Sequence, residues 1–326
     1  MKILVTGGCG YIGSHVTRQL SEDGHEVVVV DDLSSGFSDS LLHHEKLVVG
    51  DFGDSTNLDR ARALLAFDTV FHFAANVSVP ESVANPLKYY INNTSNTISL
   101  LSWCTNNRIK NFILSSTGAT YGQQEVMPVN EDAIQRPENP YAMSKLMDEL
   151  VLRDVGKAHD LNFVILRYFN VAGADPLSRI GQRTPEATHL IKVACEVATG
   201  KRHQLTVTGT DWPTPDGTGI RDYIHVEDLA SAHLAALKYL SSGGASNVFN
   251  CGYGHGSSVR DVITSFERVN KLKLRWSDGP RRAGDIAKVV ADPRKIRQVL
   301  GWQPKYDNLD AICSSAYMWE CKLNGR

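Results

Sequence analysis

The start of the chain places a glycine-rich loop between an apolar strand and a helix, and this order strongly limits the possible folds. Lys2–Thr6 has the branched apolar residues of a buried parallel strand. The next residues include Gly7, Gly10 and Gly13, and a helix is predicted from Ile12 to about Asp23. Glycines at this spacing permit a tight turn, close approach of the backbone to a pyrophosphate, and close packing of helix on strand. The segment therefore predicts a dinucleotide-binding βαβ unit.

A second apolar strand and an acidic residue complete this unit. Glu26–Val30 reads as a strand and leads directly into Asp31. A carboxylate there can accept both ribose hydroxyls of an adenosine, whereas it would repel a 2′-phosphate. The helix that starts at the glycine loop offers free amides and a positive dipole end to phosphates. We therefore expect NAD as cofactor, in preference to NADP.

Strands and helices continue to alternate through the first half of the chain. Strands are predicted at Lys46–Gly50, Thr69–Phe73, Asn111–Ser115 and Asn162–Arg167, and helices at Thr56–Leu65, Pro86–Asn106 and around Tyr141. This order predicts the α/β class: a doubly wound parallel Rossmann sheet with helices on both faces.

The regular alternation of strands and helices ends after Asn170, where the predicted loops are longer and glycine and proline cluster. We expect residues 1–170 to form the NAD-binding domain and residues 171–326 a smaller α/β substrate domain, with a helix at Ala187–Thr199. The segment from about 221 to 250, with a strand-like start and an Ala/Leu-rich helix, is expected to pack back on the first domain.

Tyr141 and Lys145 are candidates for acid–base chemistry. A helix places residues four positions apart on one face, so the lysine ammonium is expected beside the phenol. A nearby positive charge favours the phenolate and lowers its pKa, which would make Tyr141 a base for an alcohol proton. Ser115, Ser116 and Thr117 follow a predicted strand end, where ligands of doubly wound sheets bind.

The composition excludes several other classes of protein. The formal net charge of −2 gives no reason to expect a nucleic acid or an anionic membrane as partner. No apolar run approaches the length of a membrane span, and the start lacks a signal-peptide pattern. The 6 cysteines are scattered, and no residues have metal-ligand spacing, so we expect reduced thiols, no metal, and a cytoplasmic location.

Five segments carry a resemblance to a known family. Thr6–His15, Ser115–Gly122 and Tyr141–Lys145 resemble the extended short-chain dehydrogenase/reductases. Arg167–Ala174 and Asp216–Ala230 resemble the UDP-glucose 4-epimerases within that family, and the second of these segments is much more specific than a glycine loop. The resemblance runs through almost the whole chain.

The resemblance implies interconversion of UDP-glucose and UDP-galactose through a transient 4-keto sugar and NADH. Tyr141 would take the proton of the sugar 4-hydroxyl, with Lys145 and Thr117 as the other catalytic residues. The positions that match cofactor-binding residues are Gly7, Gly10, Tyr11, Ile12, Gly13, Asp31, Asp51, Phe73, Ala74, Asn92, Ser115, Tyr141, Lys145 and Tyr168. The positions that match substrate-binding residues are Thr117, Tyr141, Asn170, His189, Leu190, Arg221, Arg282, Asp285 and Val289.

Several of these matches imply specific roles. Asn170, Arg221 and Arg282 would hold the diphosphate, and Asp285 the uridine ribose. Arginine suits phosphate because its guanidinium forms two parallel hydrogen bonds.

Two further matches concern the cofactor side. Asp51 would contact adenine, and Asn92 would support the catalytic helix.

Four positions depart from the family pattern. Thr117 replaces a common serine but keeps its hydroxyl, and Asp32 replaces a common asparagine and further disfavours NADP. Val77 stands where many relatives have a lysine near the cofactor phosphates, which weakens the expectation of very tight NAD retention. Val289 stands where an aromatic residue restricts some relatives to plain hexoses, so UDP-N-acetylhexosamines are additional candidate substrates.

The sequence argues against one alternative function and leaves two others open. Related sugar-nucleotide dehydratases need an Asp-Glu pair after the active-site threonine, whereas Thr117 is followed by Gly118 and Ala119. An epimerase of another UDP sugar, such as a UDP-pentose, stays open, as does a non-catalytic NAD-sensing protein. We expect a homodimer in which helices 86–106 and 141–159 form a four-helix interface.

Overall fold

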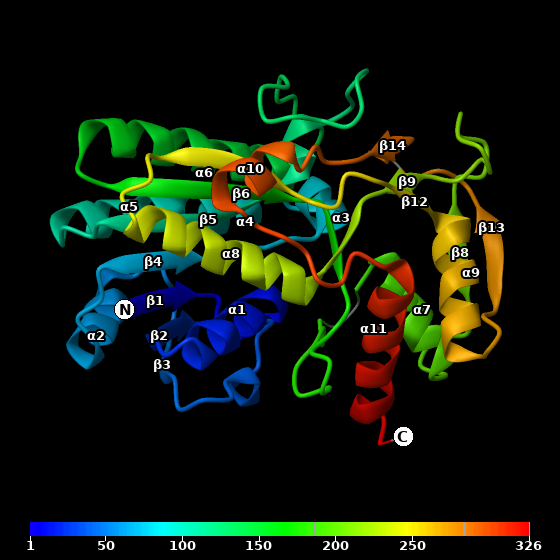
Figure 1. Cartoon of the computed structure of the whole chain (residues 1–326), viewed down its shortest axis with the longest axis horizontal. Helices are drawn as coiled ribbons and strands as arrows, with labels where there is room; N and C mark the ends of the chain where they lie inside the picture. Colours follow the sequence, from blue (N-terminus) through cyan, green and yellow to red (C-terminus); the bar gives the residue numbers. More distant parts are fainter. Residues whose placement is uncertain (185–186, 283–284, 326) are drawn as a thin grey trace.

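The computed structural model describes residues 1–184, 187–282 and 285–325. Its largest sheet has seven strands in the order β11-β6-β5-β4-β1-β2-β3, and every neighbouring pair is parallel. This sheet and its helices occupy the left part of Figure 1, and a smaller region lies to the right. The predicted doubly wound parallel Rossmann sheet is confirmed, since the strand order reverses beside β1.

The bounds of the large region follow the predicted alternation closely. Its strands are β1 (Lys2–Thr6), β2 (Glu26–Asp31), β3 (Lys46–Val49), β4 (Thr69–His72), β5 (Asn111–Thr117), β6 (Asn162–Tyr168) and β11 (Asn247–Cys251). Its helices are α1 (Tyr11–Glu22), α2 (Ser55–Leu64), α3 (Val79–Ala84), α4 (Pro86–Tyr89), α5 (Asn96–Asn106), α6 (Pro140–Ala158) and α8 (Val226–Ser241). Short 3₁₀ turns lie at Ser38–Ser40 and Gly118–Tyr121.

Two apolar layers bury the faces of the sheet. Side chains alternate along each strand, so Ile3 and Val5 pack in the layer that contains α1 and α8, whereas Leu4 packs in the other layer. That second layer contains side chains of α2, α5 and α6, such as Leu58 and Leu152. Burial on both faces explains why the strands read as continuous apolar runs.

The smaller region is built from short strands and the helices α7, α9 and α11. Its strands are β7 (Asn170–Ala172), β8 (Leu205–Thr208), β9 (Ile220–Arg221), β10 (Tyr223–His225), β12 (Ser257–Ser258), β13 (Trp276–Gly279) and β14 (Lys288–Val289). Its helices are α7 (Leu190–Ala198), α9 (Val259–Asn270) and α11 (Leu309–Leu323), whereas α10 (Arg294–Leu300) packs against β11 and α8 of the large region. A three-stranded sheet, β12-β9-β14, brings segments far apart in sequence together at the right of Figure 1.

The structure refines three of the predicted elements. The predicted helix 86–106 contains a π-helical stretch, Tyr90–Ser95, between α4 and α5. The helix predicted at Ala187–Thr199 begins at Leu190 in the structure. α8 packs against α1, and β11 pairs with β6, so chain segments beyond residue 221 lie in the layers of the large sheet.

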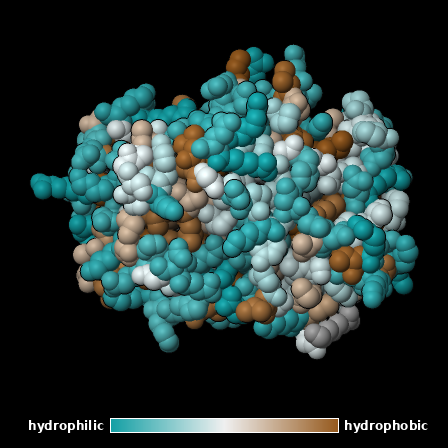
Figure 2. All heavy atoms as spheres, viewed as in Figure 1, coloured by the Kyte–Doolittle hydropathy of each residue, from teal (hydrophilic) through white to brown (hydrophobic). Residues whose placement is uncertain are grey.

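The surface in Figure 2 is predominantly hydrophilic, with hydrophobic side chains in small separate groups. Among the described residues, no helix is both long and apolar enough to cross a membrane. The segment from α4 to α5 carries several exposed apolar side chains, namely Leu87, Ile91 and Ile98.

Candidate functional site

The glycine loop after β1 has the geometry of a pyrophosphate cradle. Gly7 has a φ of +72°, and a Cβ there would lie 2.5 Å from the Ala74 amide nitrogen. A Cβ on Gly13 would lie 2.1 Å from the Gly7 carbonyl oxygen. Larger residues at either position would collide with backbone, so the loop and α1 can approach this closely only with glycine. Gly10 precedes α1 as its N-cap, and Tyr11 and Ile12 begin the helix.

Asp31 closes the site at the carboxyl end of β2. Its carboxylate accepts hydrogen bonds from the backbone amides of Cys9 and Leu33, both at 2.9 Å. These bonds fix the acid beside the glycine loop. Burial raises the pKa of Asp31, and the two amide bonds oppose the rise. The Gly50 amide donates to the Asp31 carbonyl at 3.0 Å, which brings Asp51 beside this end of the sheet.

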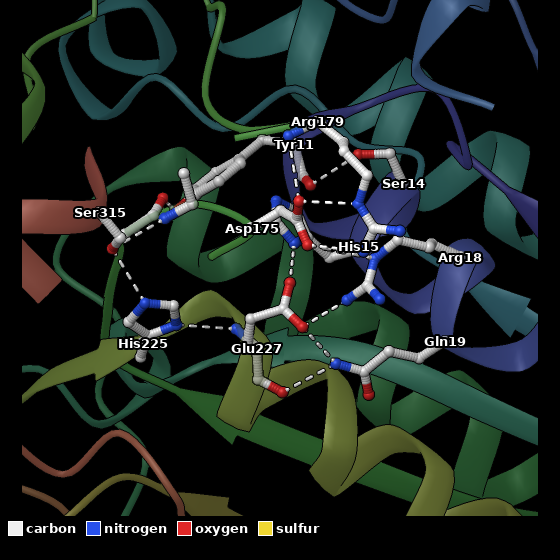
Figure 3. Close-up of polar contacts among 12 residues, drawn as sticks. Tyr11, Ser14, His15, Arg18, Gln19, Asp175, Arg179, His225, Glu227 and Ser315 are labelled. Carbon is white, nitrogen blue, oxygen red and sulfur yellow. Dashed lines mark hydrogen bonds and ion pairs between the residues drawn. The ribbon is translucent and has the colours of Figure 1, made fainter. Parts of the chain in front are cut away.

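A buried polar cluster holds the first turns of α1 against the smaller region (Figure 3). The Tyr11 hydroxyl donates to the Gly173 carbonyl at 2.6 Å. Glu227, at the start of α8, accepts hydrogen bonds from His15, Arg18 and Gln19 of α1. The position of the glycine loop therefore depends on chain segments more than 150 residues later in sequence.

Thr117 and Tyr141 come together as the sequence predicts. Thr117 ends β5, and Tyr141 lies in the first turn of α6, whose N-cap Asn139 accepts from the Ala142 amide at 2.9 Å. The Tyr141 side chain forms a hydrogen bond with Thr117. Lys145, one turn further along α6, is buried with 3% of its side chain exposed. The three predicted catalytic residues thus share one end of the sheet.

The expected lowering of the Tyr141 pKa is wrong in this structure. Burial raises the pKa of the phenol to about 12, the hydrogen bond with Thr117 opposes this rise, and the charge of Asp148 adds to it. Lys145 donates to Asp148 Oδ2 at 3.0 Å, so a carboxylate offsets its positive charge. The helical spacing predicts where the lysine lies but omits its counter-ion.

The expected support of the catalytic helix by Asn92 also needs correction, because the neighbouring residue makes the contact. Asn93 is fully buried, and its Nδ2 donates to Ser144 Oγ at 3.0 Å and to the Asn76 carbonyl. The Asn92 side-chain amide instead donates to Asn93 Oδ1 at 3.0 Å. The π-helical stretch changes the side-chain phase in this segment, and such stretches frequently lie at functional sites.

A second buried cluster supports the end of β5 from behind. The Ser116 hydroxyl donates to Glu149 Oε1 at 2.5 Å, and Arg167 Nη2 donates to Glu149 Oε2 at 2.6 Å. Ser115 and Tyr168 share a hydrogen bond of 2.7 Å between their hydroxyls. These bonds fix the backbone that carries Thr117.

Charged residues of the predicted substrate site gather in the smaller region. Arg221 on β9 lies opposite Val289 on β14 in the parallel pairing. Arg282 Nε donates to Asp285 Oδ2 at 3.3 Å. Burial lowers the pKa of Arg221, the charge of Asp285 opposes the drop, and the charge of Arg282 adds to it. Two arginines close enough to repel each other are well suited to a dianionic diphosphate.

The other predicted residues lie around these two groups. Asn170 begins β7, and its amide donates to the Asp222 carbonyl at 3.1 Å. His189 is the N-cap of α7, and partial desolvation and the charge of Arg282 lower its pKa. Leu190 is the first residue of that helix.

Phe73 and Ala74 follow β4, and the amides of both donate to the Thr6 carbonyl. This contact places them beside the glycine loop. Val77 lies further along this segment and is 52% exposed.

Two residues missed by sequence reasoning complete the catalytic end. Asp148 accepts a hydrogen bond from Lys145 and lies three residues later on α6. Residues at this spacing share a helical face, so the pair could have been found from the sequence. Tyr89 packs edge-on against Tyr141 with ring centroids 6.5 Å apart. Tyr89 lies in a helix predicted from the sequence, but its contact with the base depends on the packing of α4 on α6.

Within residues 1–184, 187–282 and 285–325, no three or more His, Cys, Asp or Glu side chains are arranged to hold a metal ion. The site therefore consists of a dinucleotide cradle, a Thr–Tyr–Lys cluster and an arginine pair. All three lie at or beyond the carboxyl ends of the large sheet's strands.

Comparisons with known proteins agree with this arrangement. Residues 3–252 match the model of the NAD dependent epimerase/dehydratase family. The chain is similar to a UDP-glucose 4-epimerase of Azospirillum brasilense, with 52% identity over 99% of this chain and 92% of the relative.

Solved structures are also similar over the whole chain. One is the UDP-glucose 4-epimerase from Bifidobacterium longum in complex with NAD⁺ and UDP, with a TM-score of 0.94, 36% identity and 100% coverage of both chains. Another is the UDP-Glc/GlcNAc 4-epimerase from Campylobacter jejuni, with a TM-score of 0.86 and 48% identity, covering 98% of this chain and 99% of that one.

Proposed function

Because the chain belongs to the NAD-dependent epimerase/dehydratase family, we propose that it interconverts UDP-glucose and UDP-galactose by epimerisation at C4. The observation that carries this proposal is the hydrogen-bonded Thr117–Tyr141 pair with Lys145 one helical turn away. The cluster lies on the same sheet end as the dinucleotide cradle. No acid follows Thr117, so this site lacks the group that dehydration requires.

The residues around the glycine loop fit NAD. The Gly7 and Gly13 positions leave room that a Cβ would fill, and Asp31 is fixed at the end of β2 to accept ribose hydroxyls. We assign the pyrophosphate to the loop and the adenosine side to Asp31 and Asp51. When bound, NAD supplies a hydride acceptor whose oxidised ring carries a positive charge.

The chain's own residues handle the proton of the sugar 4-hydroxyl. Tyr141 would accept this proton in its ionised form, which is the minor form at the raised pKa of the phenol, and would later return it as the phenol, so no net acid or base is consumed. Thr117 keeps the phenol oriented by its hydrogen bond and can donate to the sugar oxygen. Thr117 and Lys145 are buried beside the phenol, which limits the access of bulk water to the exchanged proton.

The smaller region would hold the nucleotide part of the substrate. We assign the diphosphate to Arg221 and Arg282, with Asn170, and the uridine ribose to Asp285. A firm grip on this part leaves the hexose free to present either face to the same base. We also propose the domain division given by residues 1–170 and 171–326, with 221–250 shared.

Val289 favours a second substrate class, the UDP-N-acetylhexosamines. It is 8% exposed and lies opposite Arg221 in the β9–β14 pairing. Its side chain is much smaller than an aromatic ring, which leaves volume for an N-acetyl group. The similar Campylobacter jejuni protein is described as a UDP-Glc/GlcNAc 4-epimerase.

The proposed activity is tested by incubation of the purified protein with UDP-galactose and no added reductant. We expect UDP-glucose as product, and none from the Tyr141→Phe variant, which should still bind UDP. Parallel incubations with UDP-N-acetylgalactosamine and a UDP-pentose define the sugar specificity. Turnover of the pentose alone would contradict the proposal, as would activity in the phenylalanine variant equal to that of wild type.

We also propose a cytoplasmic homodimer that uses a four-helix interface. Leu87, Ile91 and Ile98 on the α4 to α5 segment are 69%, 60% and 47% exposed. Met147 and Leu150 on α6 are 37% and 48% exposed. Exposed apolar side chains on two helices that pack together are typical of a covered face. Light scattering should give a dimer for wild type and a monomer for Ile91→Glu.

A further inference from the structure

Lys145 is paired with a carboxylate of its own helix. Its ammonium donates to Asp148 Oδ2 at 3.0 Å, and the two side chains are 3% and 0% exposed. Water is excluded from both partners, so the attraction between them is much stronger than that of a surface ion pair. The position and the effective charge of Lys145 therefore depend on Asp148.

The other oxygen of this carboxylate is poorly satisfied. Asp148 Oδ1 is buried and has no hydrogen-bond partner within the part of the chain that the structure describes. A buried carboxylate oxygen without a donor destabilises the fold. Burial raises the pKa of Asp148 to about 6, although Lys145 opposes the rise. The gain that offsets these costs is the pairing with the buried Lys145 ammonium, so the role of the acid is to be found in what it does to Lys145.

The other titratable groups around this pair leave its charge balance largely undisturbed. Burial, with the charge of Lys145, lowers the pKa of His72 on β4 well below its usual value, so this ring is neutral at pH 7. Burial raises the pKa values of Tyr168 on β6 and Tyr89 on α4, which are neutral phenols. Glu149 on α6 pairs with Arg167, and its charge adds to the rise in the pKa of Asp148.

Two polar groups complete the surroundings on the π-helical stretch and α3. The Thr94 side chain contacts the Asp148 carboxylate. Glu81 accepts from the Tyr89 hydroxyl at 2.8 Å and also pairs with Lys88. The charge that acts on the Tyr141 phenol in this structure is that of Asp148, which raises its pKa.

We propose that Asp148 is a positioning residue that holds the Lys145 ammonium in place and offsets its charge, so that Tyr141 retains its proton more strongly. The inference rests on the proposed function, in which Tyr141 must both accept and return a proton. A lysine without a counter-ion would favour the phenolate throughout the reaction and would weaken the return step. The carboxylate moderates this bias.

The test is a spectroscopic titration of Tyr141 in the full-length, NAD-loaded protein. Phenolate absorbance is followed against pH in wild type and in Asp148→Asn, each with its Tyr141→Phe counterpart as blank. We expect the Tyr141 midpoint of Asp148→Asn about one pH unit below wild type, since a nearby charge shifts a pKa by about 1–3 units. Asp148→Glu should restore the midpoint toward wild type.

A matched control and a second variant keep the test decisive. Asp154 lies on the same helix but its side chain is 80% exposed, so Asp154→Asn should titrate like wild type. If Asp148→Asn folds poorly, Asp148→Ser provides the same test because it leaves room for water beside Lys145. A wild-type midpoint in the folded Asp148 variant overturns the inference.

Failure of the inference and failure of the proposed function give different results. Epimerisation of UDP-galactose by wild type, with an unshifted midpoint in Asp148→Asn, contradicts only the role of Asp148. A shifted midpoint in a protein that does not epimerise any UDP sugar supports the role of Asp148 and contradicts the proposed function. The acid limb of kcat/KM should move with the midpoint, while the KM for UDP-galactose stays unchanged.

Discussion

Replacement of Glu227 by glutamine tests how strongly the buried cluster of Figure 3 holds the cofactor helix α1 to the start of α8. Glu227 is 8% exposed in its side chain and accepts from His15 at 2.5 Å, from Gln19 at 2.8 Å and from Arg18. Burial acts to raise the pKa of Glu227, but hydrogen bonds and charges from His15 and Arg18 lower it to about 2. The ionised acid is therefore strongly favoured in the folded protein.

The size of the effect follows from the two pKa values. The ordinary value is 4.5 and the folded value is about 2. Because each tenfold change in proton affinity corresponds to about 1.4 kcal/mol, ionised Glu227 stabilises the fold by roughly 3 kcal/mol. The folded pKa is the lower one, so this stabilisation is complete above the ordinary pKa. It is lost as pH falls from 4.5 through about 2.

The assay is equilibrium urea unfolding followed by tryptophan fluorescence. At pH 7 we expect Glu227→Gln to unfold with a free energy about 3 kcal/mol lower than wild type, and the gap should narrow below pH 4.5. Glu22 also bonds Arg18 but is 37% exposed, so Glu22→Gln should lose about 1 kcal/mol or less. A Glu227→Gln gap below about 1 kcal/mol, or one unchanged between pH 7 and 3, would refute the reasoning.

Substitutions at three further positions probe the cofactor, base and sugar sites. Gly13→Ala places a Cβ 2.1 Å from the Gly7 carbonyl oxygen, so the affinity for NAD should fall about 100-fold. An unchanged NAD content of the purified protein would contradict the assignment of the pyrophosphate to this loop. Thr117→Ser should keep its activity, whereas Thr117→Val should lose about 100-fold in kcat. Equal rates would remove the hydroxyl from the mechanism. Val289→Tyr should abolish turnover of UDP-N-acetylgalactosamine and spare UDP-galactose, and parallel loss of both would contradict the volume argument.

The parts of the fold that depend on local sequence were predictable. Gly7 and Gly13 must be glycine because backbone atoms lie within 3 Å of the position that a Cβ would take. The residue type alone therefore indicates this close contact. The apolar strands and the acid after β2 are equally local. Thr117 and Tyr141 could be brought together because one ends a strand and the other lies in the first turn of the next long helix, at one side of the sheet.

The parts that depend on helix phase and on distant partners were not predictable. Asn93, and not Asn92, contacts α6 because a π-helical stretch shifts the side chains around the helix, and no residue type announces that shift. The Tyr11 hydroxyl donates to the Gly173 carbonyl, 162 residues later in the sequence. This hydrogen bond depends on how the smaller region packs against α1. Pairwise spacing carries no information about either.

The same limit explains why the Tyr141–Lys145 spacing predicted the wrong direction for the pKa of Tyr141. The neighbours of Lys145 on its helical face include Tyr141 four residues earlier and Asp148 three residues later. A neutral phenol cannot offset the desolvation of a buried ammonium, whereas a carboxylate can, so the ammonium bonds Asp148 at 3.0 Å. The motif therefore places a lysine beside the base, but the acid outside the motif determines how much of its charge the base experiences. In this family of sites, a buried acid one turn beyond the lysine is the residue to inspect before a low tyrosine pKa is inferred from spacing.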